Sequence, residues 1–115
     1  MSDRRVASVG DRGAVTVRLA DDGAGATLGG DLDLGAYDVL ASGLEPLFER
    51  EGDVELDVAN VSVIDSSAIR LLVRLQASRT NGASVRLRHP KPHVARVLAV
   101  AGVPDLGVVV ETDGA

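Results

Sequence analysis

The fold is decided by residues 54–72, VELDVANVSVIDSSAIRLL, where two kinds of apolar spacing meet at a polar junction. Apolar and polar residues alternate over 54–58, which predicts a half-buried strand. A further apolar segment over 61–64 continues up to Asp65, and we place residues 59–66 in a loop at the functional edge of the sheet. Helical spacing follows, and we expect a helix over 66–80, because neither Gly nor Pro interrupts it and Asn-Gly comes directly after it.

The other elements are predicted from apolar spacing, turn residues and helix-ending glycines. They are a hairpin with strands at 15–19 and 26–28, a helix over 34–50, a strand at 84–88, a helix from Pro92 that Gly102 ends, and a last strand over 106–110. The order β-β-α-β-α-β-α-β predicts an α/β domain whose mixed sheet combines an N-terminal hairpin with parallel strands. We expect about three to four helices to cover this sheet.

The expected helix over 34–50 has two notable features. Asp33 stands where an N-cap residue is needed. Gly43 and Pro46 lie inside the apolar pattern and weaken it, which predicts a bend or break there.

Length and composition set the limits of the fold. With 115 residues the chain has room for one domain, which we place at 13–112 after a flexible lead-in at 1–12. Aromatic residues make up only 2%, so the core must consist of Ala, Val, Leu and Ile. The net charge of −5 argues against binding to nucleic acid or to an anionic membrane. The chain lacks cysteine, a membrane-spanning run and a secretory signal, so we expect a cytoplasmic protein.

Residues with catalytic or metal-binding chemistry are few. His89 and His93 are four residues apart, but Pro90 and Pro92 prevent them from sharing a regular helix face, and no third ligand is suggested nearby. No histidine is placed to act as a base for a serine at 66 or 67. We therefore expect neither an enzyme nor a metal site, and no cofactor.

The Asp65-Ser66-Ser67 junction has two interpretations. It can be a helix cap, for which Asp65 or Ser66 alone would suffice. It also follows the carboxyl end of a strand, where binding sites of α/β sheets lie. The helix after it carries two apolar stripes, and the second is either exposed for a partner or covered by the last helix. These stripes are Ile69, Leu72 and Val73, and Ala68, Leu71 and Leu75.

Residues 56–68 resemble the signature segment of STAS domains, and more specifically that of the bacterial anti-sigma-factor antagonists. The usual pattern there is a hydrophobic strand, a short loop and Asp-Ser-Ser-Gly. Gly30-Asp31-Leu32-Asp33 is similar to the element that ends the second strand of that family. The order of elements agrees from about residue 14 to residue 110, so the resemblance implies a STAS-like fold.

In that family the partner is an anti-sigma factor that is also an ATP-dependent serine kinase, and it phosphorylates the first serine of the motif. The resemblance implies that Ser66 is the acceptor, that Asp65 orients it and that Asp31 and Asp33 lie at the partner surface. Further partner contacts are expected from Asp65, Ser67, Ala68 and Leu71. The unphosphorylated domain would hold the anti-sigma factor and free the sigma factor, and the phosphorylated domain would release its partner. We expect a monomer or weak dimer, with no direct contact to nucleic acid and no insertion into a membrane.

The chain departs from the pattern at Ala68, where the family has glycine. Its methyl group is expected to narrow the approach of a kinase to Ser66. Two other roles stay open: a STAS scaffold that binds without phosphorylation, and an accessory subunit of a lipid-exporting, ABC-type membrane transport system.

Overall fold

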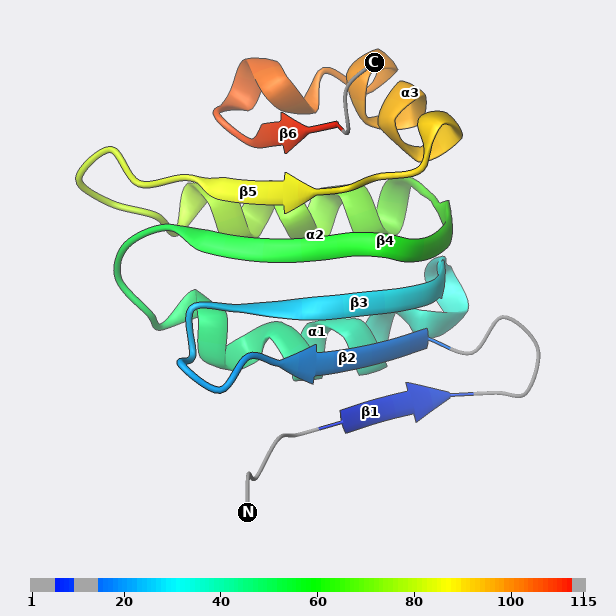
Figure 1. Cartoon of the computed structure of the whole chain (residues 1–115), viewed down its shortest axis with the longest axis horizontal. Helices are drawn as coiled ribbons and strands as arrows, with labels where there is room; N and C mark the ends of the chain where they lie inside the picture. Colours follow the sequence, from blue (N-terminus) through cyan, green and yellow to red (C-terminus); the bar gives the residue numbers. More distant parts are fainter. Residues whose placement is uncertain (1–5, 10–14, 113–115) are drawn as a thin grey trace.

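The computed structural model describes residues 6–9 and 15–112 (Figure 1). The strands are β1 (Val6–Val9), β2 (Val15–Leu19), β3 (Gly25–Leu32), β4 (Val54–Ile64), β5 (Val85–Arg88) and β6 (Val109–Glu111). The helices are α1 (Tyr37–Phe48), α2 (Ser66–Ala77) and α3 (Pro92–Val100), with the 3₁₀ helices η1 (Leu34–Ala36) and η2 (Val103–Leu106).

The strands form one sheet in which spatial order follows chain order from β1 to β6 (Figure 1). β2 pairs antiparallel with both β1 and β3, whereas β3, β4, β5 and β6 are parallel. The predicted α/β fold, with an N-terminal hairpin and parallel strands, is therefore confirmed.

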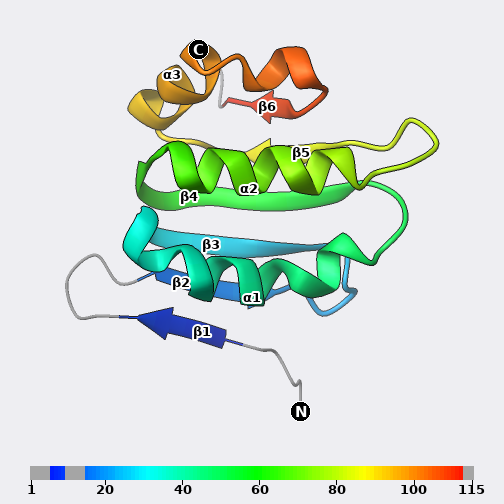
Figure 2. The same ribbon diagram turned by 180° about the vertical axis from the view of Figure 1, so that it is seen from behind.

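Helices α1 and α2 lie side by side on one face of the sheet (Figure 2). The apolar side chains of the strands point to this face and are buried under the helices. Among the described residues, the buried apolar side chains are all Ala, Val, Leu or Ile, as the composition predicts. The alternate side chains of the strands point to the opposite face, which is polar. They include Thr16, Arg18, Thr27, Glu55 and Asp57.

Helix α1 is continuous through Gly43 and Pro46, so the predicted break is absent. Pro46 lies in its last turn, and Gly43 is buried against β2. A Cβ at Gly43 would lie 2.8 Å from Cβ of Val17, so this glycine allows the helix to approach the sheet closely. The helix also begins later than predicted, because η1 takes the first three residues of the expected range.

The structure corrects several predicted boundaries. Residues 6–9, assigned to the lead-in, form β1, while the rest of the lead-in lies outside the described residues. β4 continues through residues 59–64, which the sequence placed in a loop, and β3 continues through Gly29-Gly30 to pair with it from Glu55 to Ile64, with two shifts in register. Leu106 belongs to η2, and the last strand is β6. Helix α2 ends at Ala77 rather than at residue 80.

Candidate functional site

The junction between β4 and α2 is organised by the carboxylate of Asp65. Its Oδ1 accepts hydrogen bonds from the Ser67 amide at 2.9 Å, the Ser67 hydroxyl at 2.6 Å and the Ala68 amide at 3.2 Å. Its Oδ2 accepts from the Leu34 amide at 3.0 Å. Asp65 is therefore the N-cap of α2, and it also fixes the start of η1 beside that helix.

These hydrogen bonds alter the acidity of Asp65. Desolvation by burial raises the pKa of the carboxyl group, but the bonds from the Ser67 hydroxyl and from the amides of Ala68, Ser67 and Leu34 lower it. The hydrogen bonds prevail, and the pKa lies below its ordinary value of 3.8. Asp65 is consequently ionised at neutral pH and holds a fixed negative charge beside Ser66.

Ser66 occupies the first position of α2, and its side chain is exposed. Within residues 6–9 and 15–112, its hydroxyl takes part in no hydrogen bond, in contrast to the half-buried Ser67 hydroxyl that binds Asp65. The capping role therefore belongs to Asp65 with the help of Ser67. The Ser66 hydroxyl stays accessible at the start of a capped helix.

Pairing between β3 and β4 brings the two predicted acidic residues to the same end of the sheet. Asp31 is paired with Val63, and the Asp65 amide donates to the Leu32 carbonyl at 3.0 Å. Asp31 and Asp33 are half-exposed. Neither forms an ion pair within the described ranges, and the Asp33 side chain does not make the predicted capping bond. The structure thus places Asp31 and Asp33 at the end of the sheet where the Asp65–Ser66 junction lies.

Two residues predicted to contact a partner are buried instead. Ala68 is 1% exposed and Leu71 is 2% exposed, and both belong to the hydrophobic core. Their side chains offer no surface to a partner, because the second apolar stripe of α2 packs inside the domain, where α2 contacts α1, β5 and η2. The methyl group of Ala68 points inward, so it does not narrow the approach to Ser66.

The sequence did not indicate two exposed apolar side chains close to this junction. Leu34, in η1, is 73% exposed, and Val63, near the end of β4, is 46% exposed. The sequence placed Val63 in the loop over 59–66, whereas β4 continues through it to Ile64, and alternation does not tell which face of a strand a helix covers. Leu34 fell at the start of the predicted helix over 34–50. The sequence does not tell whether a single apolar residue at a helix end faces the core or the solvent.

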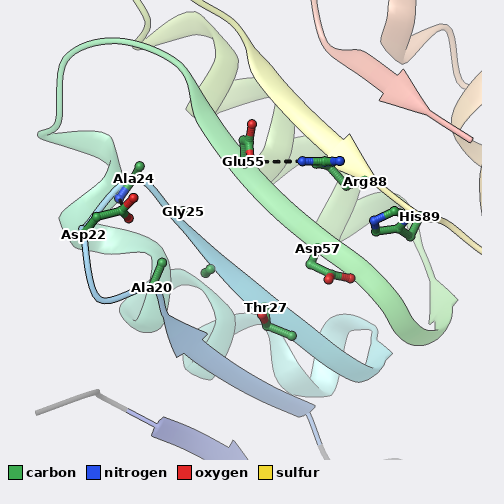
Figure 3. Close-up of a pocket in the computed structure, with 10 residues that line it drawn as sticks. Ala20, Asp22, Ala24, Gly25, Thr27, Glu55, Asp57, Arg88 and His89 are labelled. Carbon is green, nitrogen blue, oxygen red and sulfur yellow. Dashed lines mark hydrogen bonds and ion pairs between the residues drawn. The ribbon is translucent and has the colours of Figure 1, made fainter. Parts of the chain in front are cut away.

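A polar pocket of about 270 Å³ lies on the opposite face of the sheet (Figure 3). Its lining includes Asp22, Asp57 and His89. The sequence did not indicate that these residues lie together. Arg88 also lines it, but its guanidinium pairs with Glu55 at 3.3 Å and with Glu111 at 3.1 Å. The positive charge is thus already compensated. Of the two histidines, only His89 lines the pocket, and the His93 Nε2 lies 2.6 Å from the Ser62 carbonyl oxygen.

The part of the chain that the structure describes contains no cluster of metal-ligating side chains. No group of three or more His, Cys, Asp or Glu side chains is arranged there to hold a metal ion. The same residues contain no helix that is long and apolar enough to cross a membrane.

The sequence model of the family described as "Mlab, STAS domain" matches residues 15–111. The chain belongs to the STAS domain family. The match runs from β2 to β6 and includes the Asp65–Ser66 junction and both acidic residues at the end of β3. A search of the curated proteins finds no match to this STAS domain.

Proposed function

We propose that this STAS domain is an anti-sigma-factor antagonist and has no catalytic activity of its own. Its partner is an anti-sigma factor that is also an ATP-dependent serine kinase. The unphosphorylated domain binds this partner in the cytoplasm and frees the sigma factor. Phosphorylation of Ser66 ends the complex.

One observation carries the proposal: the cap of α2 is complete without Ser66. Asp65 supplies the capping carboxylate, so the exposed Ser66 hydroxyl has no structural task among the described residues. The hydroxyl is held at the start of a 12-residue helix whose inner face is buried. It is therefore presented in one defined place, as a kinase requires of its acceptor.

The transfer step needs only ATP and the kinase. The Ser66 Oγ attacks the γ-phosphorus of ATP, an Oγ–P bond forms and the bond to the bridging oxygen of ADP breaks. ADP leaves with the bonding electrons, and the hydroxyl proton passes to a base of the kinase. The product carries about −1.5 to −2 added charges at neutral pH.

The added charge explains why the complex would dissociate. Asp65 is ionised next to Ser66, and Asp31 and Asp33 lie at the same end of the sheet. In an interface the phosphate would be desolvated beside these carboxylates, at a cost of several kcal/mol. On the free domain the same phosphate is hydrated.

The test uses purified anti-sigma-type serine kinases encoded in the source genome, each incubated with ATP and the domain. We expect mass spectrometry to find one phosphoryl group, located on Ser66. Ser66→Ala should abolish it, whereas Ser67→Ala, the matched control, should retain it. Phosphate on Ser67 alone, or none from a kinase that is active on another substrate, would contradict the proposal. Binding to the ATPase subunit of a membrane transporter would instead favour the accessory-subunit alternative.

A further inference from the structure

Arg70 follows Ser66 by one helical turn on the exposed side of α2. Both side chains are exposed, and residues four apart on a helix are neighbours on its surface. Among the residues that the structure describes, the Arg70 guanidinium has no hydrogen bond and no ion pair. A free cation therefore stands beside the proposed acceptor.

At the start of α2, the amides of the second, third and fourth residues already have acceptors. The amides of Ser67 and Ala68 donate to the Asp65 side chain, and the Ile69 amide donates to the Asp65 carbonyl at 3.0 Å. A phosphate on Ser66 would have to displace Asp65 to reach the amides of Ser67 and Ala68. The start of α2 thus offers a phosphate fewer donors than a helix N-terminus without a capping side chain.

The charged groups around Ser66 favour one direction for a phosphate. The ionised Asp65 repels it from the N-terminal side, and Asp31 and Asp33 add negative charge at that end of the sheet. Arg70 attracts it toward the next turn of α2. The following basic residue, Arg74, lies two turns from Ser66 and donates to the Tyr37 hydroxyl at 3.1 Å.

We propose that Arg70 binds the phosphate of phosphorylated Ser66 within the same helix. An anion four residues before a cation is the favourable orientation on a helix, and guanidinium matches phosphate oxygens in a two-pronged hydrogen bond. The phosphate then rests on the surface of α2 while Asp65 keeps its cap. The biological meaning rests on the proposed phosphorylation of Ser66, but the ion pair is testable without a kinase.

The test installs phosphoserine at position 66 during translation and follows the phosphate by ³¹P NMR as pH is varied. Guanidinium favours the doubly ionised phosphate, so its second pKa, ordinarily about 6, should lie about 0.3 pH units lower in wild type than in Arg70→Gln. Arg74→Gln is the matched control and should titrate like wild type. Arg70→Lys should restore part of the difference, because the charge is retained without the planar fork.

The outcomes separate the two proposals. Equal titration of the wild type and Arg70→Gln, with circular dichroism showing both folded, would overturn the role of Arg70. If the second pKa of the phosphate is lower in wild type than in Arg70→Gln but no kinase modifies Ser66, the ion pair is established and the proposed function is overturned. We also expect phosphorylation to raise the Tm by about 1–3 °C more in wild type than in Arg70→Gln.

Discussion

At the residue scale, Asp65 joins two parts of the domain that are distant in sequence. One oxygen caps α2 and the other binds the Leu34 amide of η1. The carboxylate therefore stabilises the terminus that presents Ser66 and holds the exposed Leu34 close to it. This dual role explains why an aspartate suits the position better than a serine, which has a single acceptor oxygen.

We expect Asp65→Ala to lower the free energy of unfolding by about 1–2 kcal/mol at pH 7, because a cap and a long-range hydrogen bond are lost. The pKa of Asp65 is depressed in the folded state, so its contribution is complete above its ordinary value of 3.8 and is lost as pH falls through the folded pKa. Urea unfolding should therefore show that the difference in the free energy of unfolding between wild type and Asp65→Ala becomes smaller below about pH 4.

Asp33→Ala provides the matched control for this prediction. Asp33 precedes η1 in an extended conformation, but its side chain makes no capping bond. Its replacement should change stability by no more than about 0.5 kcal/mol. A gap between wild type and Asp65→Ala that widens at low pH would contradict the assigned ionisation of Asp65.

At the element scale, Arg79 connects the ends of α1 and α2. It is 8% exposed and donates to the carbonyls of Leu47 and Gly52, each at 2.8 Å, and more weakly to those of Phe48 and Leu75. Desolvation, and repulsion from Arg50, lower its pKa, but hydrogen bonds to carbonyl oxygens compensate the buried charge. The guanidinium thereby caps the last turn of α1 and ties the following loop to α2.

Arg79→Ala should lower the free energy of unfolding by about 2–4 kcal/mol, because several carbonyls lose a charged donor at once. Arg79→Lys should recover only part of this loss, since an ammonium group cannot reach the same carbonyls as a planar fork. Thermal unfolding measures both, with Arg74→Ala as an exposed control of the same residue type. Equal stability of Arg79→Ala and Arg74→Ala would show that the hydrogen bonds from Arg79 to the backbone carbonyls contribute little to stability.

The packing of α1 on β2 leads to a prediction at Gly43. Alanine is the better helix former by about 1 kcal/mol, but its Cβ would meet the Val17 side chain at 2.8 Å. Overpacking costs about 1–3 kcal/mol, so we expect Gly43→Ala to be destabilising on balance. In the Val17→Ala background, Gly43→Ala should lower the free energy of unfolding by a smaller amount. A double-mutant cycle from urea unfolding measures this coupling. Additive effects would contradict the close contact.

Sequence patterns predicted what depends on local periodicity and missed what depends on neighbours. Alternating residues located β2, β5 and the first part of β4, and the motif at 65–67 indicated the candidate site. The length of β3 was underestimated, because Gly29-Gly30 is typical of a turn and only pairing with β4 keeps it extended. The exposure of Leu34 and the burial of Leu71 likewise follow from which faces the tertiary structure covers.

At the scale of the whole molecule, β1 is an edge strand that precedes the part of the chain matched by the family model. The family match covers 15–111. β1 pairs antiparallel with β2 and lies beside α1. The strand that the sequence did not predict is thus an addition to the segment that defines the family.

Removal of residues 1–9 should therefore leave a folded domain with the same far-UV circular dichroism per residue over the remaining chain. We expect hydrogen exchange to increase at amides of β2 that pair with β1, because β2 becomes the edge of the sheet. Exchange in β4 and β5, three and four strands from β1 in the sheet, should not change. Ser66, at the start of α2, should then accept phosphate at the wild-type rate from the same kinase. Loss of protection throughout the sheet would instead make β1 part of the cooperative core.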